Sequence, residues 1–74
     1  MMEEMVSHLI IYLLKVDGTY IREVYELTRS ITLAECMSFA EDHREAIATF
    51  DDAKNRWWLN DGSGNAWFGS ECVK

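Results

Sequence analysis

Cysteine and histidine side chains have the strongest chemistry in this sequence. They are Cys36, Cys72, His8 and His43. A structural zinc site needs pairs of ligands a few residues apart, and no two of these four side chains have that spacing. Cysteine catalysis needs a thiol that a neighbouring base activates, whereas Cys36 falls on an apolar helical stripe that favours inert packing. We therefore expect no metal site and two free thiols, as in a reducing cytoplasm.

Oxygen ligands and carboxylates are the next candidates for chemistry. The segment Asp61-Gly-Ser-Gly-Asn65 lacks the spaced aspartates and final glutamate of a calcium loop, and the lysine and helix of a phosphate loop. Glu23 is the one carboxylate that we place on the core side of a strand. A chain of 74 residues has little room for the pocket that would raise its pKa. The sequence therefore predicts a protein that is not an enzyme and carries no cofactor.

All three tryptophans flank this glycine-rich loop, in the stretch RWWLNDGSGNAWFG. Successive residues of a strand point to opposite faces, so Trp57 and Trp58 must separate. With a symmetrical loop, Trp58 pairs with Trp67 on the outer face beside Arg56, and Trp57 turns inward with Phe68. Tryptophan and arginine are enriched at binding hot spots, where each contributes roughly 2 kcal/mol or more.

Two alternatives stay open for this hairpin. A tryptophan pair also stabilises a hairpin by roughly 0.5–1.5 kcal/mol beyond area burial, without any binding role. A tight turn at Asp61-Gly62 would shift the register by one residue and place Trp57 opposite Ala66. The separation of Trp57 from Trp58 survives either register.

An amino-terminal hairpin is predicted from residues 6–16 and 20–27, two apolar runs on either side of Asp17-Gly18. This dipeptide favours a two-residue type I′ turn. The resulting register assigns one face to the core, with the pairs Leu14 and Ile21, Tyr12 and Glu23, Ile10 and Tyr25, and His8 and Leu27. The opposite face, with Leu9, Ile11 and Leu13, is either an association surface or covered by more chain.

A helix is predicted from Thr32, because Thr32-Leu-Ala-Glu35 is a capping box. Its apolar stripe is formed by Leu33, Cys36, Met37 and Ala40. Its acidic side is formed by Glu35, Glu41, Asp42 and Glu45. We expect a strand at about residues 46–51, and then the tryptophan hairpin.

These elements predict one α+β domain over residues 1–74, a small antiparallel sheet of four or five strands with one α-helix packed on one face. A chain this short buries only about 60% of its unfolded surface, so its stability is marginal. The formal charge of −6 disfavours direct binding of nucleic acid and favours a basic partner. The start Met-Met-Glu-Glu-Met lacks a basic signal-peptide region, and residues 9–14 are too short for a membrane span. We expect a cytoplasmic protein.

The order of these elements resembles that of small phage- and prophage-encoded proteins, in particular anti-CRISPR inhibitors of ββαββ type. The resemblance rests on Ile31-Thr-Leu-Ala-Glu35, the hairpin from Trp57 to Trp67, and Cys72. It implies a non-enzymatic inhibitor that binds a host defence complex in the bacterial cytoplasm and blocks its nucleic-acid site. The proteins in question use basic side chains, whereas this chain is acidic.

The leading hypothesis is therefore a binding module for a bacterial host protein or complex that has a basic or nucleic-acid-binding surface. In this hypothesis the acidic helix side mimics phosphate charge. The partner-binding residues that we predict are Trp58, Trp67, Arg56, Glu35, Glu41, Asp42 and Glu45. The alternative is a self-associating protein that forms a homodimer by strand or face pairing.

Overall fold

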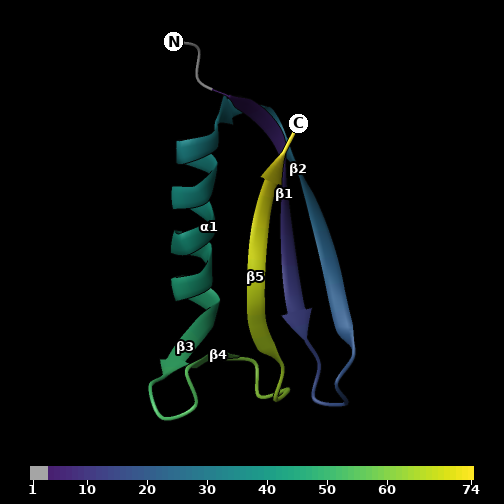
Figure 1. Cartoon of the computed structure of the whole chain (residues 1–74), viewed down its shortest axis with the longest axis vertical. Helices are drawn as coiled ribbons and strands as arrows, with labels where there is room; N and C mark the ends of the chain where they lie inside the picture. The colour runs from purple at the N-terminus through teal and green to yellow at the C-terminus, as the bar shows by residue number, and fades with distance from the viewer. Residues whose placement is uncertain (1–3) are drawn as a thin grey trace.

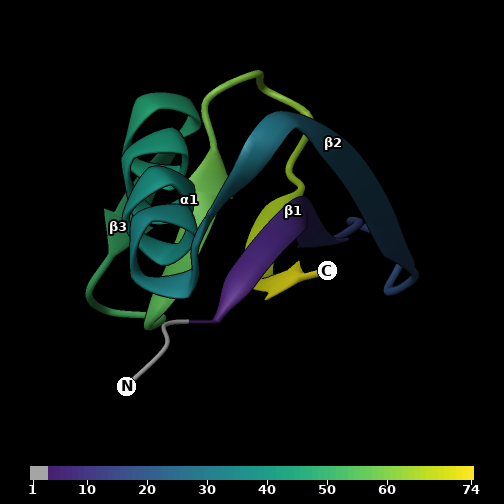
Figure 2. The same ribbon diagram turned by 90° about the horizontal axis from the view of Figure 1, so that it is seen from above.

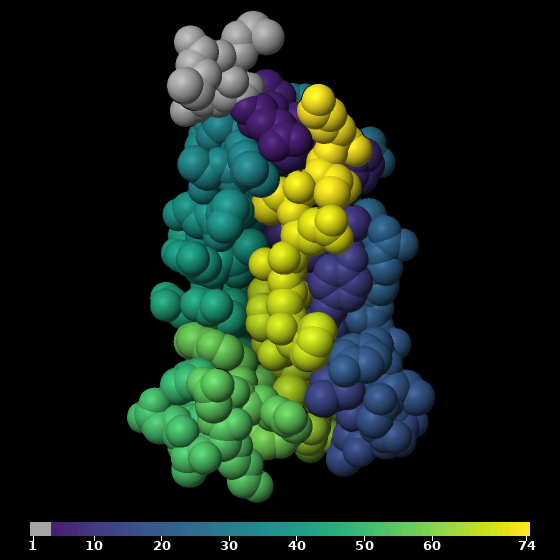
Figure 3. All heavy atoms as spheres, in the orientation of Figure 1, coloured from purple at the N-terminus to yellow at the C-terminus, as the bar shows by residue number. Residues whose placement is uncertain are grey.

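The computed structural model describes residues 4–74 and has one helix packed against a five-stranded antiparallel sheet (Figure 1). The elements are β1 (Met5–Leu14), β2 (Tyr20–Thr32), α1 (Leu33–Ile47), β3 (Ala48–Asp51), β4 (Arg56–Leu59) and β5 (Ala66–Val73). Across the sheet the strands follow the order β2-β1-β5-β4-β3. In the space-filling view, β5 is seen between α1 on one side and β1 and β2 on the other (Figure 3). The predicted α+β fold is confirmed. The Met-Met-Glu segment, on which the expectation about a signal peptide depends, lies outside the described residues.

The turn between β1 and β2 is longer than the predicted type I′ turn. The amide of Lys15 donates to the Thr19 carbonyl at 2.7 Å, and the Gly18 amide donates to the Lys15 carbonyl at 3.0 Å. Gly18 has φ 90°, so this is a three-residue loop, a type I turn that ends in a left-handed glycine. Lys15 thus lies opposite Thr19 in place of Val16, and the predicted register is wrong by one residue.

This shift turns β1 over relative to β2, because a one-residue slip moves the side chains of one strand to the opposite face. Ile21, Glu23 and Tyr25 of β2 stay on the side predicted for the core. The observed pairs are Leu13 and Ile21, Ile11 and Glu23, and Leu9 and Tyr25. Leu9, Ile11 and Leu13, which we assigned to the second face, belong to the core under α1. Their face is therefore covered by chain. The predicted core-face residues Ile10, Tyr12 and Leu14 lie on the opposite face, which we call the open face; among them Ile10 is still buried.

The helix begins as the sequence predicts. The Thr32 hydroxyl accepts from the Glu35 amide at 3.1 Å, and the Glu35 carboxylate accepts from the Thr32 amide at 3.4 Å. Cys36 and Ala40 are buried against the sheet, whereas Met37, predicted on the same stripe, is exposed. The helix runs to Ile47, and its buried line follows the positions three and seven residues after Leu33, so Met37 falls on its flank. The strand expected from residue 46 begins at Ala48.

The tryptophan hairpin has a register between the two that the sequence suggested. Trp57 pairs with Trp67, and Trp58 pairs with Ala66. In the pairing of β5 with β1, Leu13 lies opposite Trp67 and Tyr12 opposite Gly69, so Phe68 is an extra residue at a bulge. Trp67 is consequently buried (7% exposed) and Phe68 is 63% exposed. The predicted outward Trp67 and inward Phe68 are both wrong, but the separation of Trp57 from Trp58 is confirmed.

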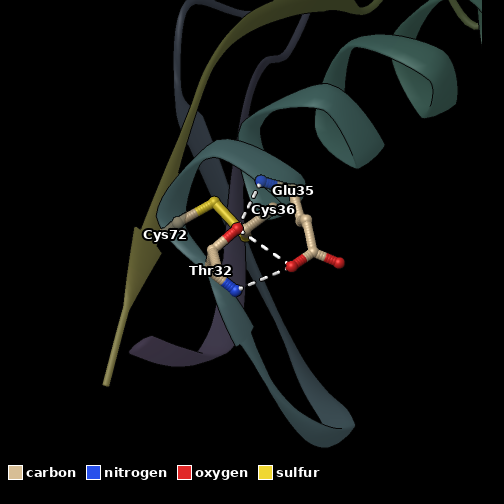
Figure 4. The surroundings of a disulfide bond; sticks show 4 residues. All are labelled: Thr32, Glu35, Cys36 and Cys72. Atoms are coloured by element: carbon tan, nitrogen blue, oxygen red, sulfur yellow. Dashed lines mark hydrogen bonds between the residues drawn. A yellow bond between two sulfur atoms is a disulfide. The ribbon is translucent and has the colours of Figure 1, made fainter. Parts of the chain in front are cut away.

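A disulfide joins Cys36 to Cys72, with a Cα–Cα distance of 6.3 Å (Figure 4). Cys72 lies opposite Leu9, on the side of the sheet that α1 covers. The bond therefore ties the first turn of α1 to the end of β5. The expectation of two free thiols is wrong, because spacing along the chain does not reveal that a helix start and a final strand meet. Closing a loop of this size stabilises a fold by about 4 kcal/mol through the unfolded state.

Candidate functional site

Trp58 lies on the open face and is held by its neighbours. Its indole nitrogen donates to Asp51 Oδ2 at 3.2 Å, which lowers the pKa of the Asp51 carboxyl. The guanidinium of Arg56 lies 5.4 Å from the ring centroid, and the ammonium of Lys54 lies 6.0 Å from it. The half-buried ring is therefore a cation–π platform. Of the predicted hot-spot residues, the structure brings Trp58 and Arg56 together.

Trp67 belongs to the core instead. Its ring lies 6.1 Å from the His43 imidazole of α1, and its strand partner is Trp57. The guanidinium of Arg44 covers the Trp57 ring at 4.2 Å. The predicted outer pair of Trp58 and Trp67 does not exist, since the two rings lie on opposite faces of the sheet.

The acidic residues of α1 do not adjoin Trp58. Glu35, Glu41, Asp42 and Glu45 are all exposed, but α1 packs on the other face of the sheet. Glu35 is also engaged in the capping box. The tryptophan surface and the acidic helix side, predicted to act together, thus cannot meet one flat partner surface.

A groove between β2 and α1 is lined mainly by apolar side chains. Its volume is about 550 Å³. Leu9 and Ile11 of β1 form its floor, and Phe39 projects from the helical side with 57% of its side chain exposed. The remaining lining residues are Tyr25, Glu26, Leu27, Thr28, Arg29, Ile31, Glu35 and His43.

The groove results from a bulge in β2. Val6 pairs with Ile31 and His8 pairs with Glu26, so residues 27–30 lie opposite the single residue Ser7. The extra chain makes β2 bow away from β1 and arch beside the start of α1, as the view from above shows (Figure 2). The groove lies between the arch and the helix, above the buried side chains of Leu9 and Ile11.

The lining of the groove is typical of a recognition site. Such sites are mainly apolar with a few polar groups that orient the ligand. Here Glu35, Arg29 and His43 provide the polar groups. Burial raises the pKa of the Tyr25 phenol, and the nearby Glu23 carboxylate adds to the effect. This site was not predicted from the sequence, because residues 28–31 were assigned to no element between the predicted strand and the capping box; that gap was the available signal.

Within residues 4–74, no three side chains of His, Cys, Asp and Glu are grouped so that they could hold a metal ion. The one helix of these residues is too short and too polar to cross a membrane. Comparison of the chain with protein-family models, with curated proteins and with solved structures gave no match.

Proposed function

We propose that this protein is a small, non-enzymatic binding module that holds an apolar segment of a partner protein in the groove between β2 and α1. The observation that supports this most directly is the pair of exposed aromatic side chains that line the groove, Phe39 of α1 (57% exposed) and Tyr25 of β2 (42%). A groove between an edge strand and a helix is a common way to take up a peptide segment, with pockets that select its side chains.

The charge of the chain supports a basic partner. The formal charge is −6, and Glu35 lies on the rim of the groove. At 100° per residue, Asp42 falls on the groove side of α1, whereas Glu41 and Glu45 fall on its other flank. Basic residues beside an apolar anchor of the partner would meet Glu35 and Asp42. Complementary charge of this kind speeds association and sets orientation.

The narrower form of this proposal is a phage-type inhibitor, anti-CRISPR-like, that blocks a bacterial host protein or nucleic-acid-processing complex. It rests on the resemblance in the order of elements. In this form Glu41 and Glu45 would occupy a basic nucleic-acid site beside the groove contact. The Cys36–Cys72 disulfide favours an oxidising compartment, so an inhibitor that works in the host cytoplasm would have to function with both thiols reduced.

A pull-down with matched variants tests the binding proposal. Phe39 and Met37 are similarly exposed on two flanks of α1 (57% and 54%). We expect Phe39→Asp to abolish capture of the partner, and Met37→Asp, with the same added charge, to leave it intact. Circular dichroism must first show that both variants are folded.

Trp58→Ala provides the second comparison, because it removes the platform on the open face. The groove proposal expects capture by this variant to persist. Loss of capture with Trp58→Ala and retention with Phe39→Asp would overturn the groove and restore the surface predicted from the sequence.

A further inference from the structure

The outer edge of β2 is the longest free strand edge of the sheet. β2 has 13 residues and pairs on one side only, with β1, and its part near the β1–β2 turn lies away from α1 (Figure 1). The hydrogen bond from the Lys15 amide to the Thr19 carbonyl shows which residues of β2 hydrogen-bond to β1. In an antiparallel pair, successive residues alternately bond to the neighbour and point away from it. Ile21, Glu23 and Tyr25 therefore bond to β1, and the amides and carbonyls of Tyr20, Arg22, Val24 and Glu26 point outward.

The sequence of this edge is complementary to itself about Val24. Two residues before it is Arg22 and two residues after it is Glu26. Three residues away on either side are the apolar Ile21 and Leu27. Val24 itself is exposed (53%). Reversing this stretch thus pairs opposite charges with each other and apolar residues with each other.

We propose that two copies of the chain pair antiparallel through β2, with the two-fold axis at Val24. In this register each Arg22 lies opposite Glu26 of the second copy, on the open face. Val24 lies opposite Val24 of the second copy. The backbone amides and carbonyls of Arg22, Val24 and Glu26 all point away from β1. The residues that face each other in this register are therefore also those that can hydrogen-bond to the second copy. Opposite charges across a strand pair are favourable and like charges are not.

The neighbouring registers are disfavoured by the same charges. A two-fold axis at Arg22, Glu23 or Glu26 places that residue opposite the same residue of the second copy, which brings like charges together. An axis at Tyr25 places Ile21 opposite Arg29 and forms no ion pair. The charge pattern of β2 thus selects one register.

Pairing would join two sheets into one and leave both helices on the same side. Ile21 of the second copy would lie opposite Leu27, at the rim of the groove, and would lengthen its apolar wall. The dimer does not require a ligand in the groove, so it can be tested independently of the proposed function.

Charge reversal with complementation tests the register. Sedimentation equilibrium should show a reversible dimer for the wild type. We expect Arg22→Glu and Glu26→Arg each to weaken self-association about tenfold or more, because each brings two like-charged pairs together. An equimolar mixture of the two variants should regain the wild-type affinity, since opposite charges then face each other at both positions. Lys15→Glu, the same charge change in the turn, should have little effect.

A cysteine at the axis provides a second, independent readout. Residues that face each other in a hydrogen-bonded pair have Cα atoms about 5.5 Å apart, within reach of a disulfide. Val24→Cys should therefore form a covalent dimer on mild oxidation, and Tyr20→Cys should not. A wild type that stays monomeric at millimolar concentration, a mixture that fails to recover, or equal crosslinking at both positions would each overturn the proposal.

Discussion

The two ends of the sheet are stabilised by different kinds of bond. At the end where α1 begins, the Cys36–Cys72 disulfide and the Thr32–Glu35 capping box fasten the helix to the strands (Figure 4). At the other end, three turns are each held by one aspartate. Asp17, Asp51 and Asp61 all accept hydrogen bonds from backbone amides two residues further along the chain.

This difference assigns different roles to the two ends. The arch of β2 and the groove adjoin the covalently closed end, where Glu35 lines the groove beside Cys36. A recognition site gains affinity when its walls are fixed before the ligand arrives. The turns at the other end hold no part of the groove, so they can loosen without altering it.

Removing the disulfide should have the largest effect. We expect the Cys36→Ser, Cys72→Ser double variant to lose about 4 kcal/mol of unfolding free energy, because its unfolded chain is no longer looped. Urea denaturation measures the change. Dithiothreitol should lower the stability of the wild type by a similar amount and leave the double variant unaffected. A loss of unfolding free energy below about 1 kcal/mol would mean that the disulfide does not hold its end of the sheet more strongly than the turns hold the other end.

Thr32→Ala should be next in size. It removes the hydroxyl that accepts from the Glu35 amide, and the loss of such a cap costs about 1 kcal/mol. Chemical denaturation should show the loss, and Ser38→Ala, an exposed position within the same helix, serves as the control. Equal effects at both positions would mean that the cap does not fix the helix start.

Trp58→Phe probes the other end and should cost less, about 0.5–1 kcal/mol. Phenylalanine keeps an aromatic face for Arg56 but cannot donate to Asp51. A double-mutant cycle with Asp51→Asn isolates the hydrogen bond. Additive losses in that cycle would show that the pair contributes nothing to the closure of this end.

Acid should act on the turns alone and have the smallest effect on overall stability. The pKa values of Asp17, Asp51 and Asp61 all lie below the ordinary 3.8, because their carboxylates accept hydrogen bonds from Thr19, Trp58 and Ser63 respectively. Their stabilisation is therefore complete above the ordinary pKa and disappears as the pH falls through the lowered values. Amide exchange by NMR should show loosening of the three turns below pH 3.8, with the amides of residues 33–36 still protected. Uniform loosening would contradict this.

Local signals in the sequence predicted the elements well. The capping box placed the start of α1, and strand alternation separated Trp57 from Trp58. Pairing was not predictable to the residue, because Asp17-Gly18 can end either a two-residue or a three-residue loop and the two differ by one step in register. That single step reversed the two faces of β1 and left those of β2 as predicted.

The candidate site was harder to predict than the fold. Trp67 turns inward because β5 bulges at Phe68 to stay paired with β1, and β1 is distant in sequence. The disulfide likewise depends on the meeting of α1 and β5. The groove depends on four residues of β2 opposite Ser7, of which the sequence shows only an unassigned gap before the capping box. Each of these features depends on a contact between segments far apart in the sequence. Propensity and periodicity describe only the residues within one segment.

The disulfide also determines how this molecule would respond to a pulling force. The start of β1 and the end of β5 lie at the same end of the sheet, so tension applied there would separate the two strands one residue pair at a time. Cys36 and Cys72 are 36 residues apart, and the segment between them would stay closed. A tether pulled from both ends would lengthen to roughly 120 Å, about half the reach of the reduced chain.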